Sequence, residues 1–166
     1  MHAAPANRII REITDDELKR SARVIRDSFR TVAVEFGLTR ENSPTHASFT
    51  TVTQLRKLKY KDARFFGLFI GKKQVGFAAI EKADDDLYYL EKLAVLPKYR
   101  HCGYGEELVK FTINYVNNEN GNRISIGIID EHTVLKNWYK RLGFKEITKK
   151  KFPQFRFTAC FMEMDV

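Results

Sequence analysis

Cysteine is scarce in this sequence: Cys102 and Cys160 are the only two among its 166 residues. Two cysteines are too few for a disulfide framework, and these two lack the spacing of a metal site. We therefore expect free thiols in a reducing compartment and no bound metal ion.

Long apolar runs are missing as well. No uninterrupted apolar stretch approaches the roughly 20 residues that a membrane-spanning helix needs. The opening residues, MHAAPANRII, also lack the basic and then apolar pattern of an export signal. These absences predict a soluble cytoplasmic protein that has no membrane partner.

The sequence has no arginine-rich arm and no aromatic and basic motif of the RNA-binding kind, although its net charge is +8. Its one dense run of positive charge, residues 149–151, is more typical of a solvated strand end than of a binding patch. We therefore expect no nucleic-acid partner, and a polyphosphate cofactor would account for part of the positive charge.

The residues that are present suit a single α/β domain over residues 1–166. Hydrophobic side chains make up 43% of the chain and include 13 phenylalanines, enough to fill one core. Apolar residues at three- and four-residue steps predict helices, and alternating or β-branched runs between turn formers predict strands. The expected strands are 7–13, 63–70, 75–81, 87–96, 123–129, 144–152 and 155–165, and the expected helices are 18–36, 49–59, 103–118 and 133–142.

Residues 90–111, LEKLAVLPKYRHCGYGEELVKF, join a buried strand to a helix through a basic, glycine-rich turn. Pro97 stops the strand, and Gly103 lies where the helix begins. Free N–H groups at the positive end of a helix can hold a phosphate without help from a side chain. Arg100 adds a positive charge where such a phosphate would lie. After this helix, we expect Gly121 in the left-handed conformation.

The pattern Arg-x-x-Gly-x-Gly after a strand that reads LAV-x-P resembles the acetyl-CoA-binding motif of the GCN5-related N-acetyltransferase (GNAT) family. Residues 137–144, NWYKRLGF, resemble a later helix of that family, in which a tyrosine precedes a Gly-Phe pair. The resemblance implies the GNAT acyl-CoA N-acyltransferase fold, a mixed central sheet with elements in the order β-α-α-β-β-β-α-β-α-β-β. It also implies acetyl-CoA as co-substrate.

The resemblance further implies which residues hold this co-substrate. In the family, main-chain groups of the strand before the turn pair with the pantetheine arm, and N–H groups of the turn hold the pyrophosphate. The strands at this point usually splay apart, often through a bulge, and a free N–H near Val95 would then stabilise the oxyanion. The implied cofactor-binding residues are Leu93, Ala94, Val95, Arg100, His101, Cys102, Gly103, Tyr104 and Gly105.

Acetyl transfer to an amine needs a proton acceptor, and Glu91 is our first candidate. It is a carboxylate inside an otherwise apolar strand, where burial would raise its pKa. Glu81, at the end of the preceding strand, is the alternative, and the two could act through a water. An ion pair with a basic neighbour is the structural alternative for Glu91. For the proton donor, the resemblance implies Tyr139 near the thioester sulfur, whereas its structural alternative is a core aromatic beside Trp138.

His132 stands where the family often has an asparagine that bonds to the pantetheine arm. It could make that contact, act as a further base, or only cap the helix. Asn137, on the same helix but at a different spacing, is a second candidate for cofactor contact. In the family, the segment between the first two helices commonly forms a wall of the acceptor site. By that resemblance, the candidates for substrate binding are Glu35, Thr45, His46 and Phe49, although His46 suits an exposed loop equally well.

Together these observations predict an enzyme that transfers acetyl from acetyl-CoA to a primary amine by direct attack in a ternary complex. The compact chain favours a small-molecule acceptor over a protein amine. A non-catalytic acyl-CoA-binding sensor is the alternative from another class, and nucleic-acid binding is a weaker third. The closing strands 144–152 and 155–165 could pair with another copy to form a homodimer.

Overall fold

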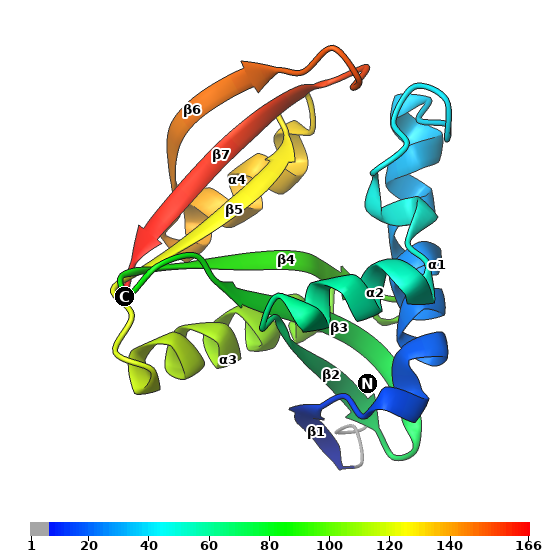
Figure 1. The fold of residues 1–166 in the computed structure, drawn as a ribbon. Helices are drawn as coiled ribbons and strands as arrows, with labels where there is room; N and C mark the ends of the chain where they lie inside the picture. Colours follow the sequence, from blue (N-terminus) through cyan, green and yellow to red (C-terminus); the bar gives the residue numbers. More distant parts are fainter. Residues whose placement is uncertain (1–6) are drawn as a thin grey trace.

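The chain, described for residues 7–166 by a computed structural model, folds into a seven-stranded mixed sheet with helices on both faces (Figure 1). The strand order is β1-β2-β3-β4-β5-β7-β6, and each neighbouring pair is antiparallel except β4 and β5. The mixed α/β fold expected from the sequence is thereby confirmed. The strands are β1 (Arg8–Glu12), β2 (Arg64–Ile70), β3 (Lys73–Lys82), β4 (Leu87–Val95), β5 (Arg123–Ile129), β6 (Lys145–Lys151) and β7 (Thr158–Asp165); the helices are α1 (Leu18–Phe36), α2 (Val52–Tyr60), α3 (Tyr104–Asn118) and α4 (Thr133–Leu142), with short 3-10 turns η1 (Asp15–Glu17), η2 (Ala47–Phe49) and η3 (Pro97–Tyr99).

Two hydrophobic cores lie on opposite faces of β2, β3 and β4. Phe65 and Phe77 pack in the core beneath α1 and α2, whereas their strand neighbours Phe66 and Ala78 pack in the core that α3 covers. Because successive side chains of a strand point to opposite faces, each strand serves both cores. This double burial explains why these strands are apolar almost without interruption.

The helix boundaries follow local capping signals. Thr14 and Glu17 form a capping box before α1, and Gly37 ends that helix in the left-handed conformation with φ +63°. The second helix begins later than predicted, at Val52, because Thr51 accepts a hydrogen bond from the backbone N–H of Gln54 and so caps it.

The turn after α3 differs from the sequence prediction. Asn120, with φ +64°, takes the left-handed conformation there, so the assignment of that conformation to Gly121 was wrong. Gly121 is needed for space instead, because a Cβ at this position would lie 2.6 Å from atoms of both Tyr88 and Val116. An asparagine tolerates a positive φ better than most residues, which allows this arrangement.

The sheet opens between β4 and β5. The two strands pair only over their first residues, from Leu87 with Arg123 to Tyr89 with Ser125, and then diverge. On its other edge β4 contains a bulge, since Ala79 of β3 faces Glu91 whereas Phe77 faces Ala94. Lys92, inside the bulge, has φ +53°. The bulged half of β4 therefore lies beside an open space.

The C-terminal hairpin also differs in detail from the prediction. β7 begins at Thr158, and the residues before it form a turn in which the Phe155 N–H donates to the Phe152 carbonyl. β7 has neighbours on both sides, so only β6 has an open edge in this hairpin. Every residue of β6 is exposed, and four of the seven are lysines, a composition that disfavours edge-to-edge pairing of strands.

Both cysteines are free, Cys102 at the surface and Cys160 in the core. Cys160 lies in a cluster with Asp130 and Glu146 that has the ligand types of a metal site. Lys136 already forms ion pairs with both carboxylates, so the cluster is a charge network around a buried thiol. Among the helices described, none is long and apolar enough to span a bilayer.

Candidate active site

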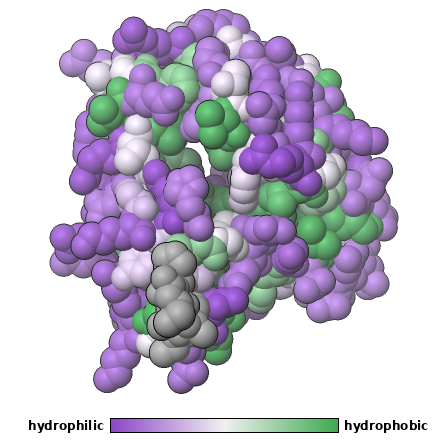
Figure 2. Space-filling model, turned by 180° about the vertical axis from the view of Figure 1, so that it is seen from behind, coloured by the Kyte–Doolittle hydropathy of each residue, from purple (hydrophilic) through white to green (hydrophobic). Residues whose placement is uncertain are grey.

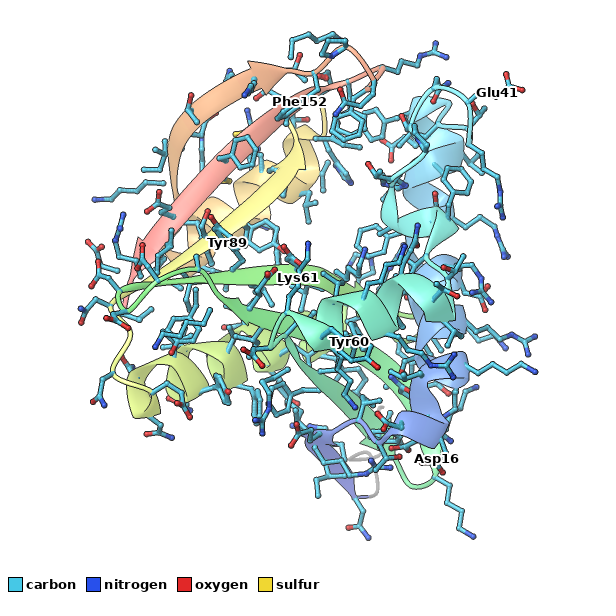
Figure 3. The ribbon with its side chains drawn as sticks, viewed as in Figure 1. Asp16, Glu41, Tyr60, Lys61, Tyr89 and Phe152 are labelled. Atoms are coloured by element: carbon cyan, nitrogen blue, oxygen red, sulfur yellow. The ribbon has the colours of Figure 1, made fainter. Side chains whose placement is uncertain are left out.

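A cleft of about 1260 Å³ occupies the opening between β4 and β5. Its walls come from α1, the segment before α2, the turn from β4 to α3, the start of α4 and the β6–β7 hairpin. Tyr89 lies where the two strands begin to diverge (Figure 3). The view from behind shows the molecule hollowed near its centre (Figure 2). This cleft contains most of the residues that the sequence singled out.

The turn from β4 to α3 presents backbone N–H groups to the cleft. His101 and Gly103 have positive φ values of +61° and +83°, which turn the chain sharply before α3. No side chain caps the N-terminus of this 15-residue helix, so its first N–H groups are available to a ligand. A Cβ at Gly105 would lie 3.2 Å from the Trp138 ring, so a side chain there would need that ring to shift slightly. The turn therefore suits an anion such as a phosphate.

Arg100 does not extend into this turn. Its Nη2 donates to the Ser28 carbonyl at 2.5 Å, its Nη1 to Thr31 Oγ1 at 3.0 Å, and its Nε to the Val95 carbonyl at 3.2 Å. Burial lowers the pKa of its guanidinium. The side chain thus ties α1 to the end of β4, which differs from the expected position beside a phosphate.

The other residues of β4 and the turn divide between cleft and core. Leu93 and Val95 line the cleft, and beyond Tyr89 this edge of β4 has no partner strand. Ala94 also reaches the cleft, although its methyl group packs in the α1 core. Cys102 is exposed and does not line the cleft; its thiol donates to the Arg100 carbonyl at 3.4 Å. Tyr104 is buried and lines the cleft.

Glu91 and Glu81 lie on the same face of neighbouring strands, and one residue pair, Ile80 with Leu90, stands between them in the β3–β4 register. Burial raises the pKa of Glu91, and the nearby Glu81 raises it further by charge and by a hydrogen bond between the two carboxyl groups. Lys92 and Lys61 act in the opposite direction; Lys61 follows α2 and lies over β4 (Figure 3). Glu91 lines the cleft and Glu81 does not. The pair can therefore share a proton at the edge of the cleft.

Tyr139 lies on the opposite wall and is only 5% exposed. Its ring packs edge-on against Trp138 and Phe144, at centroid distances of 4.9 and 5.3 Å. Burial raises the pKa of its hydroxyl, which keeps the phenol protonated at neutral pH. Tyr139 lines the cleft, and burial alone, with no hydrogen bond from the described residues, acts on the pKa of its hydroxyl. It is therefore a core aromatic that also borders the cleft.

His132 caps α4, the third of the roles left open by the sequence. Its Nδ1 accepts a hydrogen bond from the Leu135 backbone N–H at 3.4 Å. Burial lowers the pKa of the ring, and the ring lies 5.3 Å from that of Phe36. With Nδ1 an acceptor, the neutral ring carries its proton on Nε2. His132 lines the cleft, whereas Asn137 points to solvent outside it.

The acceptor-site candidates are also divided. Glu35, Thr45 and His46 line the cleft, but Phe49 does not and instead packs against His46. His46 is half-buried, its Nδ1 accepts from the Ser48 N–H, and burial together with Lys92 lowers its pKa to about 4. The loop position considered for His46 is therefore not an exposed one.

Sequence reasoning missed several residues that line this part of the cleft. Phe152, Phe155 and Phe157 of the β6–β7 hairpin face the cleft, and the Phe155 and Phe157 rings stack at 4.9 Å. The dense aromatic run KFPQFRF could have indicated them. Nothing in the sequence distinguishes Lys92 from the other lysines, because its position depends on the bulge.

An opened strand pair beside an uncapped helix N-terminus defines a site for a ligand with an extended arm and an anionic group. Comparisons with known proteins show the family to which the chain belongs. The model of the acetyltransferase (GNAT) family matches residues 29–144. The chain therefore belongs to the GNAT acetyltransferase family, which confirms the resemblance seen in its two motifs.

Individual relatives are more distant. An uncharacterized N-acetyltransferase of Chlorobaculum tepidum is 30% identical over 98 residues, which span 59% of this chain and little more than half, 57%, of that protein. The crystal structure of the ribosomal-protein-S18-alanine N-acetyltransferase from Escherichia coli has a TM-score of 0.77 at 17% identity, covering 96% of this chain and 94% of that one. The PaiA N-acetyltransferase of Thermoplasma acidophilum, in complex with coenzyme A, has a TM-score of 0.74 at 18% identity, covering 96% and 99%. These structures share the fold.

Proposed function

We propose that this protein is an acetyl-CoA-dependent N-acetyltransferase whose acceptor is a primary amine of a small molecule. The observation that supports this most is the content of a single cleft. The uncapped N-terminus of α3, the unpaired edge of β4, Glu91 and Tyr139 all border it, although they belong to different elements.

The co-substrate would lie along β4 and the turn. Acetyl-CoA supplies the acetyl group as a thioester. The N–H groups at the start of α3 suit its pyrophosphate, and the backbone of Leu93 and Val95 offers hydrogen-bonding groups to its pantetheine arm. The Nε2–H of His132, at the start of α4, is a further donor that borders the cleft.

Glu91 would take the proton that the amine must lose before it can attack. Its raised pKa makes it a stronger base than an ordinary carboxylate, and Glu81 can share the proton. The neutral amine then forms a C–N bond to the carbonyl carbon, and the C–S bond breaks. Tyr139 would give its proton to the departing thiolate and would regain, through water, the second proton that the nitrogen releases as it becomes an amide. The proton held by Glu91 then passes to solvent. Backbone N–H groups near the bulge would stabilise the oxyanion.

The acceptor side of the cleft favours a small molecule. The His46 and Phe157 rings lie 6.5 Å apart and so join the segment before α2 to the β6–β7 hairpin. Phe29 lies 5.8 Å from His46 on the α1 side. These contacts narrow the cleft, which Glu91 also lines, where α1, the segment before α2 and the β6–β7 hairpin meet.

Release of thiol from acetyl-CoA across a panel of amines tests this proposal, in the wild type and in Tyr139→Phe. We expect turnover with one class of amine and its collapse in the variant. A protein acceptor is the second candidate, because an E. coli structural neighbour is a ribosomal-protein acetyltransferase, so the panel should include peptides. Tight CoA binding without turnover of any amine or peptide would support the non-catalytic sensor instead.

We also propose that the chain works as a single domain in the cytoplasm, which its free cysteines support. Pairing of two copies through β6 would produce a homodimer, and sedimentation at several concentrations would detect it. The lysines of β6 oppose that pairing.

A further inference from the structure

Lys92 occupies an unusual position in the cleft. It lies within the β4 bulge with φ +53°, a conformation that side-chain-bearing residues rarely adopt. Such strained positions concentrate at functional sites. The bulge places its side chain, half-buried, among the residues that line the cleft.

The ammonium group of Lys92 lacks a counter-ion. Within residues 7–166 it forms no ion pair and no side-chain hydrogen bond; the one carboxylate that acts on it, Glu91, does so only through its charge. Burial accordingly lowers the pKa of Lys92. A buried cation without a partner is costly, so an anion that enters the cleft would be bound there.

His46 adds a second donor to the same region. Its Nδ1 accepts from the Ser48 N–H at 3.3 Å and lies 2.7 Å from Ser48 Oγ. With the hydroxyl as the second donor to Nδ1, the neutral ring carries its proton on Nε2. Both side chains line the cleft, and the charge of Lys92 contributes to the lowered pKa of His46. Phe29 and Phe157 flank the half-buried imidazole, with ring centroids 5.8 and 6.5 Å from its own. Two donors in a partly dry, aromatic surrounding suit a carboxylate.

The carboxyl pair of Glu91 and Glu81, next to Lys92, attracts a ligand group of the opposite charge to the one that Lys92 attracts. Glu91 precedes Lys92 in the chain and lines the same cleft, and its pKa is raised by burial and by the nearby Glu81. A cationic or neutral amine is attracted to Glu91, whereas an anionic group is attracted to Lys92. A ligand that satisfies both must carry an amine and an acidic group only a few bonds apart.

We propose that Lys92 binds a carboxylate of the acceptor, so that the acceptor is an amine with a carboxylate close to its amino group, as in an amino acid. This proposal rests on the proposed acetyltransferase function and narrows its substrate class.

Matched acceptors test it. The common amino acids are compared with their amides and with the amines that remain after decarboxylation, by thiol release from acetyl-CoA. For the preferred acceptor we expect kcat/KM to exceed that of its amide about 10- to 100-fold, because an ionic hydrogen bond is lost. In Lys92→Met this preference should shrink to about threefold or less, mainly through KM, while the affinity for CoA stays unchanged.

Methionine has a long unbranched side chain, as lysine does, and pays the same cost at the positive φ of position 92. Backbone strain is therefore equal in the two proteins. Lys61→Met is the matched control, because Lys61 also acts on Glu91 but lies outside the cleft. It should retain the preference for the acid over the amide.

The contrary results distinguish failure of this proposal from failure of the proposed function. Equal turnover of acid and amide in the wild type, turnover of carboxylate-free amines only, or an undiminished preference in Lys92→Met would overturn the role of Lys92 and leave the acetyltransferase function standing. If no amine is acetylated although CoA binds, the proposed function fails and this proposal fails with it.

Discussion

Replacement of Arg100 by alanine distinguishes two roles for this side chain. The sequence places its charge beside a phosphate, whereas the structure uses it to tie α1 to β4 by three hydrogen bonds. Hydrogen bonds from a charged donor are worth roughly 1.5–3 kcal/mol each, but this guanidinium is only half-buried and water would replace part of the loss. We therefore expect Arg100→Ala to lower the free energy of unfolding by about 2–4 kcal/mol.

For a chain of this length, such a loss lowers Tm by roughly 5–15 °C. Urea unfolding gives the free energy, and calorimetric titration of CoA gives its Kd for the same variant. We expect the Kd to rise by less than about tenfold, because the phosphate site that we propose consists of backbone N–H groups. The control is Arg23→Ala, whose exposed ion pair with Asp27 spans 3.9 Å and whose loss should change stability by less than about 0.5 kcal/mol.

The opposite pattern would refute this reasoning. Unchanged stability of Arg100→Ala, together with a CoA affinity that falls more than tenfold, would place the guanidinium on the phosphate. Arg100→Lys also distinguishes the two roles. If the charge alone matters, this variant should bind CoA as the wild type does. If the three hydrogen bonds matter, it should recover only part of the stability that Arg100→Ala loses.

Three further predictions follow from particular side chains. Tyr139→Phe should lower kcat about 100-fold without a loss of stability, because no hydrogen bond from the described residues acts on its hydroxyl; stopped-flow thiol release and urea unfolding measure both, and an unaltered kcat would remove Tyr139 from the chemistry. The pKa of Glu91 is raised in the folded state, so above the ordinary glutamate pKa the native protein keeps a proton that the unfolded chain has lost. The free energy of unfolding therefore falls as the pH rises through the folded-state pKa. Glu91→Gln should therefore be more stable than the wild type at pH 7, with a difference that vanishes near pH 4 in a series of unfolding curves. Gly121→Ala should cost about 1–3 kcal/mol, because its Cβ would meet Tyr88 and Val116 at 2.6 Å; a thermal melt unchanged by this substitution would contradict the packing.

The sequence predicted those features that depend on neighbouring residues. The helix 18–36 and the glycine-rich turn before α3 lie where they were expected, because local signals set them: the capping box at Thr14, the left-handed Gly37 and the glycines of the turn. The bulge at Lys92 depends on the register between β3 and β4, which no short stretch encodes. The hydrogen bonding of Arg100 could not be predicted for the same reason, since its partner Ser28 lies 72 residues away.

Gly121 shows a different limit. A glycine after a helix suggests a left-handed turn, but here space between Tyr88 and Val116 requires it, and Asn120 makes the turn. The late start of β7 has a similar origin: the Phe152–Phe155 turn and the stacked rings of Phe155 and Phe157 hold these residues at the cleft. Packing across the molecule decided both cases.

The central claim is that the opening between β4 and β5 binds acetyl-CoA and brings it to an amine. Its most direct test is calorimetric titration of the wild-type protein with CoA, followed by mass spectrometry of the products of acetyl-CoA and the preferred amine. The account predicts one CoA bound per chain, and equal amounts of free CoA and acetylated amine. Absence of CoA binding, or release of CoA without an acetylated amine, would contradict it.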